Sequence, residues 1–240
     1  MLDYVIIDKK LKNAIKLVNF LYEKNEHFRI VAIYDCIEKL LIFLQERDID
    51  LILIKVNHYE YRKLLENNLL KEKCKSIVLI SNDNIVNKDS DINKWYGYVI
   101  DEENYEDISN IIDEFSRTKI VARIENELKY LNVRNSYLGV KFLIEAICIL
   151  YNNNVYKNCH LEKDIYPLIA QKYYKTVNNV KSNINYVVNI LYVECEEEKL
   201  KKYIEEYNIY KYSPKKIIFS ILKRIENSNI VSTQLSKGNS

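Results

Sequence analysis

The stretch LEKDIYPLIAQKYYKTVNNVKSNINYVVNILY, Leu161–Tyr192, decides the fold of the second half of the chain. Its apolar residues recur at helical spacing in two runs, with a short polar turn around 174–176 between them. The second run collects its apolar residues on one side and leaves amide and basic residues on the other. Two helices joined by a tight turn, the second with such a face exposed, are typical of a helix-turn-helix that enters the major groove of double-stranded DNA.

The polar side of the second helix supplies candidate contacts to DNA. Asn can bond adenine bidentately, and Lys can reach guanine or phosphate. The candidate base contacts are Asn178, Asn179, Lys181, Ser182 and Asn185. The candidate phosphate contacts are Lys172, Lys175, Thr176, Lys211, Lys215 and Lys216. The alternative is an amphipathic bundle helix whose polar residues face water, because helix-turn-helix patterns have many false positives.

Around this stretch the second half contains only helical patterns. Helices are expected at 119–131, 137–152, 160–173, 177–193, 196–206 and 214–227. Ser213 is a plausible N-cap, with Pro214 at the first helical position. Residues 229–240 are polar and are expected to form a flexible tail.

The first half alternates apolar runs with amphipathic helical segments. The runs lie at 4–7, 29–34, 51–54, 76–80 and 96–100. Continuous apolar runs separated by helices are typical of a parallel sheet covered on both faces, and functional groups are then expected where the strands end. The predicted fold is a doubly wound, five-stranded α/β domain followed by an all-α domain of six helices. The predicted domains are 1–116 and 121–228, joined by a linker at 117–120.

The charge is divided unequally between the two halves. Residues 1–118 carry 17 Lys and Arg against 22 Asp and Glu, whereas residues 119–240 carry 19 against 12. The net charge is therefore −5 in the first part and +7 in the second. This asymmetry favours contact between the second half and a polyanion.

Composition excludes several classes of function. Three glycines, Gly97, Gly139 and Gly238, cannot build a Gly-rich phosphate loop. Five scattered cysteines argue against a disulfide framework and a zinc site, and they suit the reducing cytoplasm. No membrane span, secretory signal or supported nucleophile–base arrangement is readable. We therefore expect a cytoplasmic protein that is not an enzyme and that needs no cofactor, metal or membrane.

Residues 119–228 resemble the effector domain of the sporulation-initiation master response regulator family. The matching pieces are Leu138–Asn153, Ile165–Tyr173, Lys175–Ser182 and Ser213–Phe219. The resemblance implies a six-helix domain whose fourth helix, 177–193, lies in the major groove, and binding to repeated sites as a dimer. The family's base-reading positions usually carry two arginines and a glutamate. Here they fall on Asn179, Lys181 and Ser182, which predicts an altered site preference.

The first half resembles a receiver domain of response regulators that has lost its phosphorylation chemistry. The resemblance places Asp8, Lys55, Ser81, Tyr98 and Asp101 around the phosphoacceptor pocket. Lys55 stands where the acceptor aspartate would be, and an ammonium neither accepts a phosphoryl group nor holds Mg²⁺. Lys55 is expected to pair with Asp8, Asp101 or both; the alternative is neutral drift, with these groups in solvent.

These patterns predict a phosphorylation-independent, DNA-binding transcription regulator of the response-regulator kind. The first domain is expected to mediate homodimerisation or contact with a protein partner, because its net negative charge disfavours DNA. The rival hypothesis is an interaction protein that dimerises with or sequesters a related regulator without reading DNA.

Overall fold

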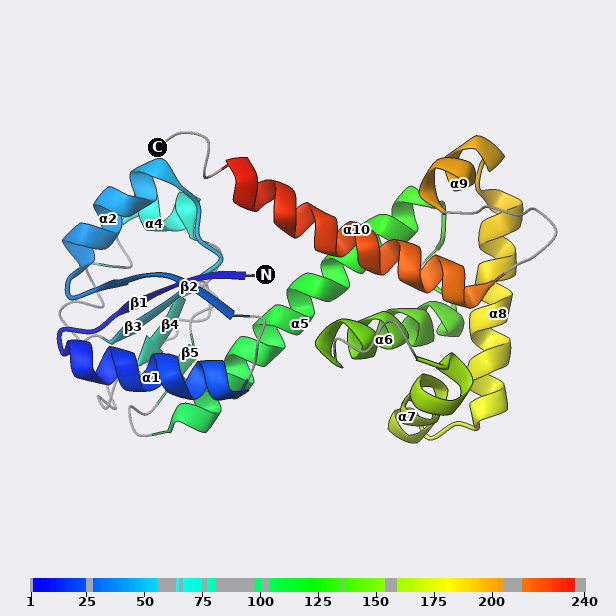
Figure 1. The fold of residues 1–240 in the computed structure, drawn as a ribbon, viewed down its shortest axis with the longest axis horizontal. Helices are drawn as coiled ribbons and strands as arrows, with labels where there is room; N and C mark the ends of the chain where they lie inside the picture. Colours follow the sequence, from blue (N-terminus) through cyan, green and yellow to red (C-terminus); the bar gives the residue numbers. More distant parts are fainter. Residues whose placement is uncertain are drawn as a thin grey trace. The chain divides into compact units, whose positions relative to one another are not determined.

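The structure is a computed structural model that describes residues 2–24, 28–55, 64, 67–74, 77–80, 98–100, 104–134, 136–153, 159–204 and 213–235. The chain divides into two compact units, Met1–Ser116 and Arg117–Ser240 (Figure 1). The first is an α/β unit and the second is helical, as the sequence predicts. The boundaries predicted for the domains remain a prediction.

The first unit is built on a parallel sheet with the strand order β2-β1-β3-β4-β5. Its elements are β1 (Leu2–Ile7), α1 (Leu11–Lys24), β2 (Phe28–Tyr34), α2 (Ile37–Glu46), β3 (Leu51–Lys55), α4 (Asn68–Lys73), β4 (Ile77–Ile80), β5 (Tyr98–Ile100) and the first turns of α5 (Tyr105–Tyr130). Helices α1 and α5 lie on one face of the sheet, and α2 and α4 lie on the other (Figure 1).

The apolar strands are explained by burial on both faces. In β3 the residues Leu51–Ile54 are all buried, and they alternate between the two cores. Leu51 and Leu53 pack with α1 and α5, whereas Ile52 and Ile54 pack with α2 and α4. A central parallel strand therefore has no solvent face, which is why its sequence is a continuous apolar run.

The second unit packs its helices around one apolar core. Its further elements are α6 (Leu138–Asn153), a π-helical turn η3 (Leu161–Ile165), α7 (Tyr166–Lys172), α8 (Val177–Glu194), α9 (Glu197–Tyr203) and α10 (Pro214–Leu235). Helix α8 packs on α6, α7 and α10. Lys216 donates its backbone N–H to the hydroxyl of Ser213 at 3.4 Å, so the predicted N-cap is present. The six-helix count remains a prediction.

Two segments are helical where the sequence predicts a linker and a tail. Residues 117–120 do not form a separate linker, because they lie inside the continuous helix α5. That segment contains neither Gly nor Pro, so nothing in it interrupts the helix. The predicted tail at 229–240 is also partly helical, because α10 continues to Leu235.

Candidate nucleic-acid interface

The turn between α7 and α8 is held by a defined set of backbone hydrogen bonds. Lys175 donates its N–H to the carbonyl of Ala170 at 2.9 Å, and Tyr174 donates to Gln171 at 3.3 Å. This is the pattern of a Schellman motif, whose central residue takes a left-handed conformation. Tyr174 occupies that position with φ 53°. The predicted two-helix arrangement with a short turn is therefore present.

Helix α8 begins at a capped N-terminus. The hydroxyl of Thr176 accepts the backbone N–H of Asn179 at 3.1 Å, which satisfies one of the free amides of the first turn. Val180, Ile184, Val187, Val188 and Leu191 are buried, as the spacing predicts. The core thus fixes the inward face of α8, and Val177 and Tyr192 of the same helix pack against this core as well.

The contact between α6 and α8 is close enough to exclude any side chain at position 139. A Cβ atom at Gly139 would overlap the backbone carbonyl of Asn183 and would lie 2.7 Å from Cγ2 of Val187. Both obstacles belong to α8, and one of them is backbone. Gly139 therefore fixes how near α8 lies to α6, and with it the position of the polar face.

The predicted base contacts on the outward face of α8 differ in how exposed their side chains are. Asn178, Asn179 and Ser182 are exposed, whereas Lys181 and Asn185 are half-buried. The amide of Asn183 donates to the backbone carbonyl of Asn179 at 2.9 Å and to its side-chain oxygen at 3.3 Å. Among the described residues, Asn178 has no such side-chain partner, so both its amide donor and its acceptor are available.

The predicted phosphate contacts separate into three groups. Lys175 and Thr176 are exposed at the turn, and no described residue pairs with the ammonium of Lys175. At the start of α10, Lys215 donates to the carbonyl of Cys159 at 3.2 Å, and Lys216 is half-buried. Lys172 is bound to an acidic residue of α6, as described next. Lys211 lies outside the described residues.

The ammonium of Lys172 lies 2.7 Å from the carboxylate of Glu145 in α6. Arg117 of α5 contacts the same carboxylate at 2.5 Å. The Glu145 side chain is only 5% exposed, so these two cations offset the cost of burying its charge. Burial, and secondarily Glu145, raise the pKa of Tyr173, which keeps its hydroxyl protonated beside this cluster. Lys172 therefore anchors α7 on α6, and its contact with phosphate stays a prediction.

Replacing Lys172 with glutamine is expected to lower the free energy of unfolding by about 1–2 kcal/mol, because a buried carboxylate then keeps only one cation. Urea denaturation followed by circular dichroism measures this change. The matched control is Lys201→Gln, which breaks an exposed pair with Glu197 at 2.7 Å and should cost under about 0.5 kcal/mol. Equal effects of the two substitutions would contradict the structural role of the Glu145 cluster.

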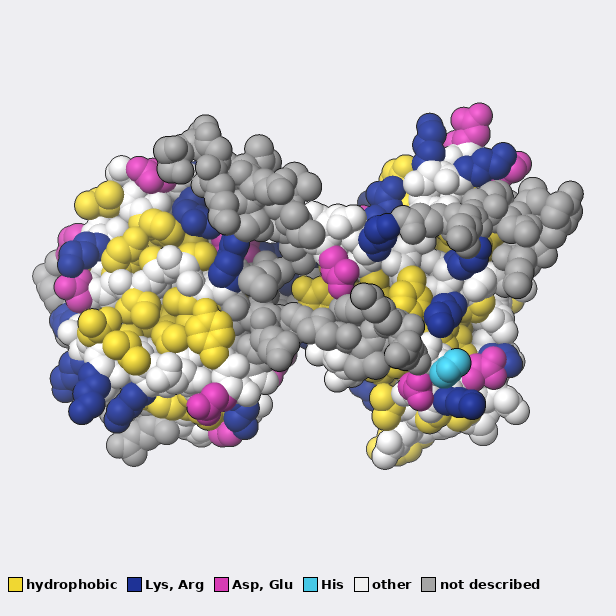
Figure 2. All heavy atoms as spheres, in the orientation of Figure 1, with side chains coloured by type: hydrophobic (Ala, Val, Ile, Leu, Met, Phe, Trp, Pro, Cys, Tyr) yellow, Lys and Arg dark blue, Asp and Glu magenta, His cyan; other side chains and the backbone are white. Residues whose placement is uncertain are grey.

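A surface hollow of about 390 Å³ lies beside the outward face of α8. It is lined by His160, Leu161, Glu162, Lys163, Tyr166, Lys181, Asn185, Ser213, Pro214 and Lys215. Figure 2 shows basic and acidic side chains around the cyan histidine of this unit. The hollow therefore brings the beginnings of η3 and α10 next to Lys181 and Asn185 of α8, although these segments lie far apart in the sequence.

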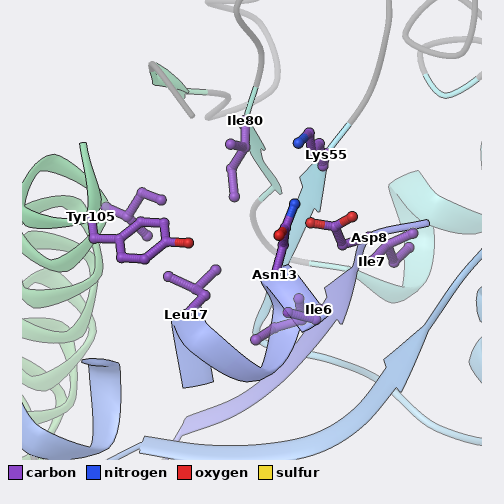
Figure 3. Close-up of a pocket in the computed structure, with 10 residues that line it drawn as sticks. Ile6, Ile7, Asp8, Asn13, Leu17, Lys55, Ile80 and Tyr105 are labelled. Carbon is purple, nitrogen blue, oxygen red and sulfur yellow. The ribbon is translucent and has the colours of Figure 1, made fainter. Parts of the chain in front are cut away.

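In the first unit, a small pocket lies where the receiver resemblance places the phosphoacceptor site (Figure 3). It is lined in part by Asp8, Asn13 and Lys55, with Tyr105 on the side of α5. Asp8 is buried and accepts the backbone N–H of Lys10 at 2.8 Å. The pocket has a volume of about 20 Å³, which has room for about one water molecule.

The predicted pairing of Lys55 stays a prediction. Strands β1 and β3 are in register at Ile7 and Ile54, so Asp8 and Lys55 follow at the same edge of the sheet. Ser81 and Asp101 lie outside the described residues. Tyr98 lies in β5, but its side chain is not described.

Sequence patterns missed three residues that shape the interface. Nothing in the sequence around Gly139 marks a close helix crossing. Glu145 could have been found, because it is one acidic residue inside the apolar run FLIEAICIL. Glu162 lies 2.8 Å from the Lys181 ammonium, and no sequence spacing signals this pair.

The described part of the chain lacks two further features. No helix there is both long and apolar enough to cross a membrane. No three His, Cys, Asp or Glu side chains there gather as they would around a metal ion.

Comparison with known proteins finds a family that the second unit resembles. Residues 124–225 match the family model described as "Sporulation initiation factor Spo0A C terminal". Comparison with curated protein sequences finds no match. A solved structure of the Salmonella typhimurium response regulator RcsB aligns at 14% identity and a TM-score of 0.36, covering 84% of this chain and 96% of RcsB. The resemblance of the second half to the sporulation regulator family is confirmed by the family match.

Proposed function

We propose, from a chain whose residues 124–225 form a Spo0A C-terminal domain, that this protein is a sequence-specific DNA-binding regulator of transcription and not an enzyme. One observation carries the proposal: the capped helix α8 is fixed by its apolar face and turns exposed amide and hydroxyl groups outward. A recognition helix needs this combination of a rigid position and free polar side chains. The +7 charge of residues 119–240 supports the same conclusion.

The proposal gives the outward residues separate roles. Asn178 and Asn179 lie in the first turn of α8, where residues of a recognition helix contact base edges. Ser182 and Asn185 continue the same side of the helix. Lys175, Thr176, Lys215 and Lys216 contact phosphates, which set affinity and orientation but not sequence preference. Asn179, Lys181 and Ser182 stand at the positions where the family usually carries two arginines and a glutamate, so we propose that the preferred site differs from the family's usual one.

The proposed control of activity does not use aspartyl phosphorylation. Lys55 ends β3. The receiver resemblance puts the acceptor aspartate at this position, and an ammonium repels the Mg²⁺ that the chemistry needs. Incubation with a small acyl phosphate and Mg²⁺ is expected to leave the intact mass of the protein unchanged, whereas a functional receiver treated in parallel gains a phosphoryl group. A phosphoryl adduct mapped to the first unit would contradict this prediction.

The first unit is proposed to mediate homodimerisation or contact with a protein partner. Exposed apolar side chains on its helices support this role, since such groups are frequent at interfaces. They are Leu11, Ile15 and Tyr22 of α1 and Ile42 of α2. Abundance or a partner would then control activity in place of phosphotransfer.

Enrichment of genomic DNA fragments by the purified full-length protein tests the proposed function. We expect a limited set of fragments to be retained, with an affinity that falls steeply as salt rises. Sequence enrichment distinguishes a regulator from a protein held only by nonspecific charge. Negligible retention at all salt concentrations would contradict the proposal.

The second candidate is an interaction protein that sequesters a related regulator without binding DNA. One observation favours it: Lys172 and Lys181, two of the cations expected on the DNA-binding surface, are already paired with carboxylates. This candidate predicts no enrichment of DNA and a stable complex with a related regulator. The same fragment experiment, repeated with that regulator present, separates the two functions.

A further inference from the structure

An acidic residue lies directly against the proposed recognition helix. The Lys181 ammonium of α8 and the Glu162 carboxylate of η3 are 2.8 Å apart, and their side chains are 43% and 61% exposed. Within α8 itself the first acidic residue is Glu194, at the opposite end of the helix. Glu162 therefore places a negative charge beside Lys181, in a part of α8 that has no acidic residue of its own.

The surroundings of this pair are otherwise suited to an anion. Lys163 and Lys215 line the same hollow as Lys181, together with the hydroxyl-bearing Ser213. A DNA phosphate that approaches Lys181 here meets these cations and also the carboxylate of Glu162. Exposed ion pairs contribute little to folding stability, so the consequence of this pair lies in what Lys181 can bind.

We propose that Glu162 is a specificity-determining residue of the DNA-binding surface, acting through Lys181; this rests on the proposed function. With any duplex, Glu162 occupies the Lys181 ammonium, one of the predicted DNA contacts of α8, and repels the phosphates that approach it. Nonspecific binding, which depends almost entirely on phosphate contacts, is therefore weakened. A cognate site also offers base acceptors to the outward amides of α8, so it depends less on Lys181. Specificity is a difference of affinities, and a repulsive element against the wrong partner increases it.

The test compares two duplexes of equal length and composition: one retained from the genomic fragments, and a scrambled version of it. Affinities are measured against salt for the unchanged protein, Glu162→Gln, Lys181→Gln and the double variant. In Glu162→Gln, one freed lysine adds one phosphate contact to the scrambled duplex. For this duplex, the slope of log affinity against log salt concentration should steepen by about 0.9. The affinity of Glu162→Gln for the same duplex should be roughly fivefold higher than that of the unchanged protein at about 0.15 M salt. Affinity for the retained duplex should rise less than about twofold, so the specificity ratio falls.

The double variant shows whether Glu162 acts through Lys181. In the Lys181→Gln background, removal of the carboxylate should change the affinity for the scrambled duplex by less than about twofold. The matched control is Glu197→Gln, which breaks a pair of similar exposure in α9 and should leave both affinities unchanged. Melting followed by circular dichroism shows that every variant is folded.

Two results would overturn the proposal while leaving the proposed function intact. The first is that Glu162→Gln changes the affinity for the two duplexes equally, or changes neither. The second is that Glu162→Gln changes the affinity for the scrambled duplex as much in the Lys181→Gln background as in the unchanged protein. Failure of the unchanged protein to bind any duplex would instead overturn the proposed function, and the role of Glu162 with it.

Discussion

Replacement of Gly139 with alanine is expected to lower the free energy of unfolding of the second unit by about 3 kcal/mol. The added methyl group meets the backbone carbonyl of Asn183 and the side chain of Val187, so α8 has to move away from α6. Backbone cannot rotate aside as a flexible side chain can. The same displacement moves the outward amides of α8, and DNA binding should weaken even under conditions where the variant remains folded.

Urea denaturation followed by far-ultraviolet circular dichroism measures this loss, because the second unit is largely helical. The matched control is Lys141→Ala, on an exposed position of the same helix, which should cost under about 0.5 kcal/mol. An unchanged urea midpoint for Gly139→Ala would show that the helices are not in close contact.

A negative charge at Ser182 is expected to weaken the affinity for DNA. Ser182→Glu should weaken binding to a retained duplex by at least about tenfold, or about 1.4 kcal/mol. Ser182 is exposed on the outward face of α8, so a carboxylate there would approach the phosphates and the acceptor edges of the bases. Folding should be unaffected, because the side chain does not pack in the core.

Affinity is measured by fluorescence anisotropy of the labelled duplex at constant salt. The matched control is Gln45→Glu, the same change of charge at an exposed position of α2 in the first unit. Ser182→Ala separates the loss of the hydroxyl from the gain of the charge and should have a small effect. If Ser182→Glu and Gln45→Glu bind equally well, the outward face of α8 does not contact DNA.

The helix-turn-helix was predictable because its determinants are local. Thr176 caps the helix three residues from the amide it accepts, and the buried positions from Val180 to Leu191 follow a helical period. The strands of the first unit were also predictable, since a central parallel strand is apolar throughout. The change in pattern at 117–120 predicts a linker, whereas the structure has helix there, because no residue in this segment stops a helix.

Contacts between distant segments could not be predicted from one sequence. Glu145 and Lys172 are 27 residues apart, and their contact depends on how α6 and α7 pack. The pair of Glu162 and Lys181 likewise depends on the placement of η3 beside α8. These pairs engage two of the lysines predicted to contact DNA, Lys172 and Lys181.

Methylation protection of a retained duplex by dimethyl sulfate tests the central claim most directly, namely that the outward face of α8 enters the major groove. The reagent methylates guanine N7, which lies in that groove. With the unchanged protein bound, we expect guanines in each half-site to be protected at N7, and Ser182→Glu at the same concentration to abolish the protection. Guanines that react as in free DNA while the protein remains bound would contradict the account.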